Sequence, residues 1–359
     1  MEVLYDYQIF QQQKYGGISR YFIELCNYMG ERNKVSLFKG YNYNEYKLGG
    51  KNKNIDVTSI KRNGFKYFKH FYNIPNYLNF RRKYLHSNVD VYHPTYYVDT
   101  GIDYKIMVVT VYDMIHEMYP ENFRFIDRTA KNKKKLLDKA DGIIAISKST
   151  KKDIVNFLKI DEQKIRVIYL ANSLRYEIES MPFVEKDYIL YVGNRRGYKN
   201  WERFIHSFAR SKYKNDIACV CFGGGEFSPN EMNLLKKYSL ENNVINISGD
   251  DSVLANLYKY ATAFIYPSEY EGFGLPPLEA MYYGTPVLAG NKSSIPEVVG
   301  DAGILFDPLN IEEITFQLDR VLSSKELRDH LMKKGVKREK EFSWARCAEE
   351  TEKYYKSLL

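Results

Sequence analysis

The chain has 359 residues, of which 44% are hydrophobic and 27% are charged, and its formal net charge is +8. This length supports two domains with separate cores, and the composition is typical of soluble globular proteins. No stretch approaches the roughly 20 apolar residues of a membrane-spanning helix, and the start, MEVLYDYQIF, lacks the pattern of a secretory signal. These features exclude an integral membrane protein and predict a cytoplasmic one.

The positive charge is concentrated in the first half of the chain. Residues 1–170 contain 29 Lys and Arg against 18 Asp and Glu, a balance of +11, whereas the remainder has a balance of −3. A basic half can face nucleic acid, a membrane surface or anionic substrates, and composition does not choose between them. The cysteines, which lack paired metal-ligand spacing, are expected to be reduced, buried thiols: Cys26, Cys219, Cys221 and Cys347.

Strands and helices are expected to alternate along residues 1–170. The predicted strands cover 2–6, 34–38, 89–92, 105–111, 142–146 and 165–169, and the predicted helices begin near 17, 125 and 147. Such alternation favours a parallel sheet with helices on both faces, and ligands of such sheets bind beyond the carboxyl ends of the strands. Gly16 and Gly17 follow the first predicted strand, and Asp113 and His116 follow 105–111, which makes all four site candidates. For the double glycine, a plain tight turn is the alternative.

The segment 61–85 interleaves basic and aromatic side chains, as in Phe65, Lys66, Phe68 and Phe71, and Pro75 is expected to break it. Preceding it, the polar stretch 40–54 is predicted to be a surface loop. The pattern of 61–85 fits an interfacial membrane helix, and it also fits a helix packed on its own domain with snorkelling lysines. We favour the packed helix, with an exposed edge used at the membrane. Single-stranded nucleic acid would suit the pattern too, but no nucleic-acid module is recognisable.

Residues 171–185 contain few apolar side chains and are expected to form a linker. Beyond it, strands are predicted at 187–193, 217–222, 243–248, 263–267 and 285–289, with helices near 229–240, 252–260, 275–283, 310–323, 324–341 and 343–358. The loop after the first of these strands carries Arg195, Arg196 and Lys199. Cations at a strand end can bind an anionic ligand, although they can also be ordinary surface charges.

The stretch from Tyr266 to Gly290 organises the second half. Glu271 and Glu279 stand eight positions apart, with a glycine-rich turn behind the first, and prolines suit the first turn of the following helix. Such a loop presents backbone N–H groups to an oxygen-rich anion, so the two carboxylates can bracket one ligand along its length. The alternative is an ordinary strand-to-helix turn with two surface glutamates.

The motif E-G-F-G-L-P-x-L-E-A-M, followed by G-T-P-V and I-P-E-V, resembles the retaining glycosyltransferases of family 4. The resemblance spans nearly the whole chain and is strongest in 188–308. It implies a GT-B fold with two facing, doubly wound Rossmann-like α/β domains and a central cleft. The implied parts are an acceptor-side domain at 1–170, a linker at 171–186, a nucleotide-sugar domain at 187–341, and a C-terminal helix at 342–359 that packs back on the first domain, anchored by Phe342, Trp344 and Tyr354.

The resemblance also implies residue roles. Glu271 would lie beside the transferred sugar, and Glu279 would hold the ribose of the nucleotide. A basic pair would grip the diphosphate: Lys199 is one member, and Arg195 is preferred over Arg196 for the other. The remaining donor contacts would come from the backbone of Gly272, Phe273, Gly274 and Leu275 and from the Gly16–Gly17 turn. The family often has T-x-H-D where this chain has Tyr112, so His116 is the candidate imidazole beside Asp113.

The implied activity is transfer of a hexose from a nucleotide-diphosphate sugar to a hydroxyl of a glycan, with retention of anomeric configuration. Resemblance to relatives in polysaccharide and O-antigen assembly favours mannose. The +11 balance of residues 1–170 and the aromatic–basic segment 61–85 favour a lipid-linked acceptor at the inner face of the cytoplasmic membrane. No D-x-D loop is placed to hold a metal, so we expect metal independence and no cofactor. The alternatives are a nucleotide-sugar epimerase or hydrolase on the same scaffold, and a basic membrane-binding or nucleic-acid-binding protein without catalysis.

Overall fold

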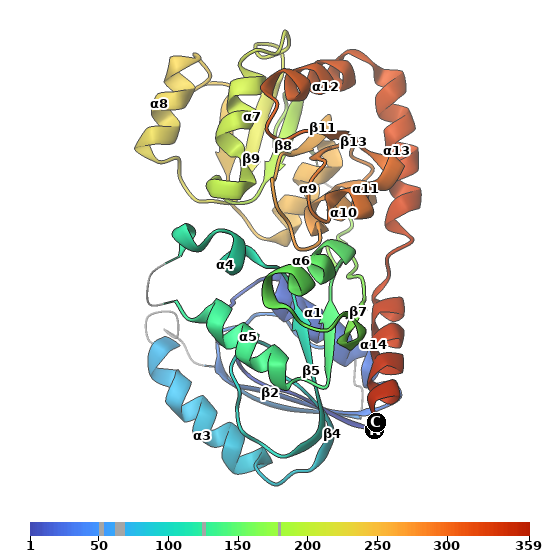
Figure 1. The fold of residues 1–359 in the computed structure, drawn as a ribbon. Coiled ribbons are helices and arrows are strands. Elements are labelled where there is room, and N and C mark those ends of the chain that lie inside the picture. Colours follow the sequence, from blue (N-terminus) through green and yellow to red (C-terminus); the bar gives the residue numbers. More distant parts are fainter. Residues whose placement is uncertain (50–53, 62–68, 124–126, 179–180) are drawn as a thin grey trace. The chain divides into compact units, whose positions relative to one another are not determined.

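A computed structural model describes residues 1–49, 54–61, 69–123, 127–178 and 181–359. They form two compact units: unit 1 comprises Met1–Leu170 with Ser343–Leu359, and unit 2 comprises Ala171–Phe342. In each unit a parallel sheet is flanked by helices (Figure 1). The predicted fold class, two doubly wound α/β domains, is confirmed. None of the helices in these ranges is long and apolar enough to cross a membrane.

Unit 1 is built on a seven-stranded sheet in the order β3-β2-β1-β4-β5-β6-β7. Every neighbouring pair is parallel. On one side of β1 lie β2 and then β3, and on its other side lie β4 to β7 in sequence order. The direction in which strands are added therefore reverses between β1 and β4. The strands are β1 Glu2–Tyr5, β2 Lys34–Asn42, β3 Ile55–Lys61, β4 Val89–His93, β5 Tyr104–Val111, β6 Gly142–Ala145 and β7 Ile165–Val167.

The helices of unit 1 pack apolar faces against this sheet. In α1, Phe22, Leu25 and Met29 are fully buried, because their three- and four-residue spacing keeps them on one face. The helices are α1 Gly17–Met29, η1 Lys69–Tyr72, α3 Asn73–Tyr84, α4 Ile115–Met118, η2 Pro120–Asn122, α5 Thr129–Lys139, α6 Lys148–Leu158 and η3 Glu162–Lys164.

Three predictions for unit 1 need correction. The polar stretch 40–54 is not all loop, because β2 continues to Asn42, and the edge strand β3 was not predicted. Pro75 does not break the helix; it lies in the first turn of α3, where a missing backbone N–H costs nothing. Residues 62–68, which include Phe65, Lys66 and Phe68, and residues 124–126 of the predicted 125–140 helix lie outside the described residues.

Unit 2 contains a six-stranded parallel sheet in the order β10-β9-β8-β11-β12-β13, which reverses between β8 and β11. The strands are β8 Tyr188–Val192, β9 Ala218–Phe222, β10 Val244–Ile247, β11 Ala263–Tyr266, β12 Val287–Gly290 and β13 Ile304–Phe306. The helices are η4 Gly197–Lys199, α7 Trp201–Phe208, α8 Pro229–Lys237, α9 Asp251–Tyr260, α10 Leu275–Tyr282, α11 Ile295–Val299, η5 Gly300–Ala302, α12 Ile311–Ser323 and α13 Lys325–Glu339. All four cysteines of the chain are buried and free, as predicted.

The last helix, α14 (Trp344–Leu358), belongs to unit 1 and lies beside α1 (Figure 1). The ring of Trp344 is 6.2 Å from that of Tyr21, and the Tyr355 hydroxyl hydrogen-bonds His93 Nδ1. Burial lowers the pKa of His93 to about 3, so this histidine is a neutral core group. The Tyr354 hydroxyl donates to the Lys164 carbonyl oxygen. Phe342 instead packs on Phe273 inside unit 2.

Candidate active site

The loop between β11 and α10 is fixed by two serines from the start of α11. The Ser294 hydroxyl donates to the carbonyl oxygens of Glu271 and Phe273, at 2.8 and 2.6 Å, and the Ser293 hydroxyl also contacts the Glu271 backbone. Although Ser294 occupies the N-cap position of α11 (Ile295–Val299), its side chain makes no cap hydrogen bond. The two serines hold the loop instead, and they fix the position at which Glu271 leaves the backbone.

Gly274 is required at the point where this loop enters α10. Its φ is +122°, a region that side-chain-bearing residues rarely adopt, and an added Cβ would lie 3.0 Å from Ile295 Cδ1. Pro276 and Pro277 follow in the first turn of the helix, as predicted. Helix α10 thus begins at Leu275, four residues after Glu271, and its first backbone N–H groups lie next to the loop.

Lys199 and Glu271 form the polar centre of unit 2. Lys199 Nζ lies 2.6 Å from Glu271 Oε1 and 3.2 Å from the Tyr266 hydroxyl. Both side chains are mostly buried. The pair joins the loop after β8 to the loop after β11, at the reversal of strand order, where α/β sheets bind ligands. Two residues predicted from separate motifs are therefore in direct contact.

Asn200 holds Lys199 in this place, a role the sequence analysis missed. Its backbone is left-handed (φ +58°), which ends η4 directly after Lys199. Its side-chain amide donates to the carbonyl oxygens of Pro267 and Pro308, at 3.1 and 2.6 Å. Asparagine tolerates left-handed backbone better than most residues, and this was the available sequence signal.

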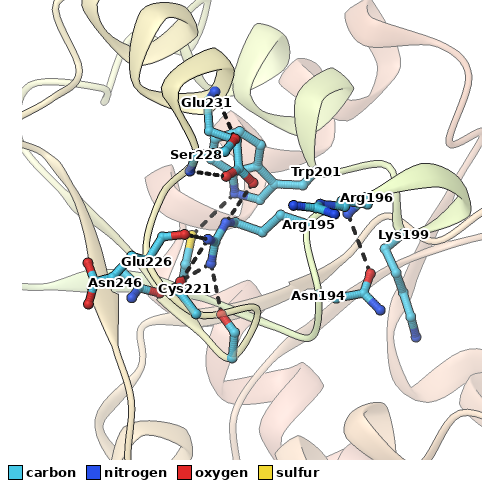
Figure 2. Close-up of polar contacts among 12 residues, drawn as sticks. Asn194, Arg195, Arg196, Lys199, Trp201, Cys221, Glu226, Ser228, Glu231 and Asn246 are labelled. Carbon is cyan, nitrogen blue, oxygen red and sulfur yellow. Dashed lines mark hydrogen bonds and ion pairs between the residues drawn. The ribbon is translucent and has the colours of Figure 1, made fainter.

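Arg195, the preferred diphosphate ligand, is instead a structural residue. Its five N–H donors are all used within unit 2: Nε bonds Glu231 at 2.8 Å, Nη1 bonds Gly223 O and Asn246 Oδ1, and Nη2 bonds Gly225 O and Glu226 O. Figure 2 shows the guanidinium surrounded by these acceptors. The side chain is only 2% exposed, so binding a diphosphate would require breaking a buried network.

Arg196 is therefore the second candidate cation, beside Lys199, for binding a diphosphate. Its side chain is exposed, and its backbone N–H donates to Asn194 Oδ1 in the same loop. Lys199 follows three residues later. The pair best suited to an anionic ligand is therefore Arg196 and Lys199, which corrects the preference for Arg195.

Glu279 lies one turn into α10, as expected from its spacing. The Tyr258 hydroxyl donates to Glu279 Oε2 at 3.1 Å, and this bond orients the carboxylate. Burial, and then the nearby Glu279 carboxylate, raise the pKa of Tyr258, which keeps its hydroxyl protonated as the donor. Glu271 thus precedes α10, and Glu279 lies one turn into it.

Four predicted site residues belong to unit 1. Gly16 and Gly17 precede and begin α1, and the Gln13 side chain accepts from the Ser19 N–H there at 3.0 Å. A Cβ on Gly16 would overlap this glutamine at 2.3 Å, so the glycine permits a close side-chain cap. The double glycine thus has a local structural role whether or not a ligand approaches it.

Asp113 and His116 lie together after β5. Asp113 Oδ1 accepts from the Ile115 N–H at 3.1 Å, and the His116 ring stacks on Phe123 with centroids 3.9 Å apart. Burial and nearby Lys133 lower the pKa of His116, so it is neutral at pH 7. Its buried Nδ1 has no hydrogen-bond partner among the described residues. Tyr112 is buried and packs on Tyr21, so its hydroxyl does not reach a surface site.

In the described part of the chain, no group of three or more His, Cys, Asp or Glu side chains is arranged to hold a metal ion. The site consists of cations, carboxylates, backbone N–H groups and tyrosine hydroxyls. These groups can bind a diphosphate and hydroxyl-rich rings.

Comparison with known proteins identifies the chain. Residues 15–171 match the profile of Glycosyltransferase Family 4, and residues 175–338 match that of Glycosyl transferases group 1. The chain is 30% identical over 290 residues to O-antigen chain mannosyltransferase B of Escherichia coli, covering 75% of this chain and 74% of the relative.

Two solved structures share the fold. Sucrose-phosphate synthase from Thermosynechococcus elongatus matches with a TM-score of 0.76 at 18% identity, covering 99% of this chain and 98% of that one. HepE from Anabaena, solved with UDP-glucose, matches with a TM-score of 0.72 at 15% identity, covering 99% and 100%. The fold and site define a two-domain GT-B glycosyltransferase. The chain belongs to glycosyltransferase family 4.

Proposed function

We propose that the protein transfers a hexose, with mannose preferred, from a nucleotide-diphosphate sugar to a hydroxyl of a cell-surface polysaccharide under assembly. The observation that carries this proposal is the Lys199–Glu271 pair at the strand reversal of unit 2. A cation for the diphosphate lies there beside a carboxylate for the sugar. Similarity to an O-antigen mannosyltransferase supports the sugar and the polysaccharide, and similarity to a UDP-glucose complex supports a nucleotide donor.

The reaction we propose retains the anomeric configuration. The bond between C1 and the diphosphate oxygen breaks, and the acceptor oxygen forms a bond to C1 on the same face. The acceptor proton passes to the departing diphosphate. Lys199, Arg196 and the first N–H groups of α10 would stabilise the charge that develops on the leaving group, and Glu271 would offset positive charge near C1. Asp113 and His116 stay predictions for the acceptor side.

This charge arrangement predicts that catalysis needs no divalent metal. Because Lys199 and Arg196 are the proposed counter-charges of the diphosphate, turnover should be unchanged, within about twofold, when excess EDTA is present. The measurement is an initial rate with and without EDTA. Loss of activity that is restored by magnesium or manganese would contradict it.

Glu279 is proposed to bind the ribose of the nucleotide, since it lies one helical turn beyond the phosphate-binding end of α10. Glu279→Ala should weaken nucleoside-diphosphate binding by about 1–3 kcal/mol, the usual scale for a charge-assisted hydrogen bond. Isothermal calorimetry measures this, with Glu241→Ala, an exposed glutamate of unit 2, as the matched control. Equal affinity of the two variants would remove Glu279 from the donor site.

A nucleotide-sugar screen tests the proposal as a whole. A donor at 100 times its Kd should stabilise the protein by about 2.7 kcal/mol, which a thermal shift detects. Mass spectrometry of the same mixtures with a mannose oligosaccharide should then show addition of one hexose. If the donor were consumed equally fast without an acceptor, the hydrolase or epimerase alternative would replace transfer.

We further propose that α3 contacts an anionic membrane. Its packed face consists of Asn76, Phe80 and Tyr84. The opposite edge of α3 exposes Ile74 at 69% and Leu78 at 58%, and the preceding helix η1 exposes Phe71 at 76%. Arg82 and Lys83 are exposed in the last turn of α3. An apolar edge beside cations is the pattern of an interfacial helix.

Membrane binding should therefore depend on both the exposed apolar side chains and the cations of this region. Each cation near an anionic surface contributes about 1 kcal/mol, and this contribution is screened by salt. Sedimentation with phosphatidylglycerol-containing vesicles should show binding that falls with added salt and with Phe71→Ser/Leu78→Ser or Arg82→Glu. Equal sedimentation with neutral and anionic vesicles would exclude this attachment.

A further inference from the structure

One buried tyrosine contacts both members of the Lys199–Glu271 pair. Tyr266 is the last residue of β11, and only 2% of it is exposed. Its hydroxyl accepts a hydrogen bond from Lys199 Nζ at 3.2 Å. The same hydroxyl is hydrogen-bonded to Glu271, and because an ionised carboxylate can only accept, Tyr266 donates its proton to that bond. The mechanism proposed above gives this hydroxyl no role, although it joins the cation to the carboxylate.

The phenol of Tyr266 is held in place independently of the two charges. Its ring stacks on Phe264, two residues earlier on the same face of β11, with centroids 5.7 Å apart. Burial raises the pKa of Tyr266 well above its ordinary value, and the charge of Glu271 raises it further. The hydroxyl is therefore protonated at neutral pH, and its proton is available to Glu271 wherever the Lys199 side chain points.

The backbones that carry Lys199 and Glu271 are fixed as well. The Tyr191 hydroxyl, from the neighbouring strand β8, donates to the carbonyl oxygens of Asn194 and Lys199, at 2.6 and 3.4 Å, and so spans the loop after β8. The serines of α11 hold the backbone of Glu271 in the loop after β11. The pair can therefore separate by rotation of the side chains, without movement of either loop.

Binding of a diphosphate would separate this pair. In the unliganded protein Lys199 and Glu271 neutralise each other at 2.6 Å, and their side chains are only 15% and 11% exposed. A diphosphate attracts the lysine more strongly, since it carries more negative charge than one carboxylate. Glu271 would then remain in a mostly buried place without its cation, which is unfavourable unless another donor satisfies the carboxylate. Tyr266 is a donor that already contacts it.

We propose that Tyr266 is a positioning residue, which holds the Glu271 carboxylate when Lys199 turns to the diphosphate of the donor. The inference rests on the proposed function and deepens it, because it names the group that lets one ion pair serve two parts of the ligand. No covalent bond changes in this step, and no proton is transferred. Lys199 exchanges a carboxylate oxygen for a phosphate oxygen, while the Tyr266 hydroxyl keeps its bond to Glu271 and holds the carboxylate in place for the sugar.

Calorimetry with a nucleoside diphosphate tests this role without turnover. GDP and UDP are titrated into the full chain, and the ligand that the wild type binds more tightly is used throughout. Tyr266→Phe should weaken its binding about tenfold to hundredfold, the loss expected for one hydrogen bond to a charged group. Tyr188→Phe is the matched control, since this buried tyrosine lies at the other end of β8 from the Lys199 loop and donates to the Leu257 carbonyl oxygen at 2.7 Å. The control should bind the nucleotide as the wild type does.

A double-mutant cycle separates positioning from packing. In Glu271→Ala no carboxylate remains to be held, so adding Tyr266→Phe should change the affinity by less than about twofold. A loss of packing alone would instead weaken binding equally with and without Glu271. In turnover, Tyr266→Phe should also lower kcat, because Glu271 is proposed to act on charge that exists only in the transition state, whereas uniformly weaker donor binding would raise KM alone.

Urea unfolding first establishes that every variant is folded under the conditions of the titration. Equal weakening by Tyr266→Phe in both backgrounds, unchanged affinity in Tyr266→Phe alone, or a loss of the same size in Tyr188→Phe would overturn the proposal. Failure of the wild type to bind either nucleotide would overturn it as well. If the cycle shows coupling but no hexose is transferred from any nucleotide sugar, the role of Tyr266 stands and the transferase function fails. Transfer without coupling would leave the function and remove the role of Tyr266.

Discussion

Glu271→Gln is expected to lower kcat by about 10²–10³-fold, the usual effect of removing one preorganised electrostatic group. The carboxylate lies 2.6 Å from Lys199, on a loop fixed by Ser293 and Ser294. A group held in this way stabilises charge without moving at the moment of reaction. Because that charge exists only in the transition state, the loss should appear in kcat more than in KM.

The same substitution should leave nucleoside-diphosphate affinity unchanged or slightly increased. In the unliganded protein Glu271 neutralises Lys199, so removing its charge frees the lysine for the diphosphate. Glu269→Gln is the control, since Glu269 is two residues away and pairs with Arg203 instead. Near-normal kcat in Glu271→Gln, or a loss of nucleotide binding as large as in Glu279→Ala, would show that its role is misassigned.

Neighbouring arginines should give opposite phenotypes. Arg195→Met is expected to lower the free energy of unfolding of unit 2 by about 3–5 kcal/mol, because it leaves Glu231 and several carbonyl oxygens without their buried partner. Arg196→Met should change stability by less than about 0.5 kcal/mol, as expected at an exposed position. It should instead weaken nucleoside-diphosphate binding.

Urea unfolding and calorimetry on the two variants separate these effects. For Arg195→Met, binding is measured at low temperature, where the folded fraction remains high. A stable Arg195→Met protein with poor nucleotide affinity, next to an Arg196→Met protein with normal affinity, would restore Arg195 as the diphosphate ligand and contradict the assignment made from its hydrogen bonds.

The pair of arginines also illustrates what sequence patterns can predict. The strand β8 and the cations after it were predictable, because a buried apolar run ending in polar residues marks a strand end. Which arginine faces inward was not predictable, since a loop has no periodicity to orient its side chains. The acceptors of Arg195 lie 28 to 51 residues further along the chain, on a glycine turn, α8 and β10.

Short-range sequence patterns predicted where residues lie within, or next to, a regular helix or strand. The positions of Glu271 and Glu279 relative to α10 followed from the glycines, the prolines and helical spacing. The contact of Glu271 with Lys199 depends on which strands are neighbours, and the strand order is a property of the whole sheet.

One measurement tests the central claim, that the Lys199–Glu271 site transfers a hexose with retention. The protein is incubated with mannotriose and either GDP-mannose or UDP-glucose, both α-linked donors, and the product is examined by NMR at the new anomeric centre. We predict a product one hexose longer whose new linkage is α, formed by the wild type and almost absent with Glu271→Gln. A β-linked product, or free hexose without an extended glycan, would contradict the account.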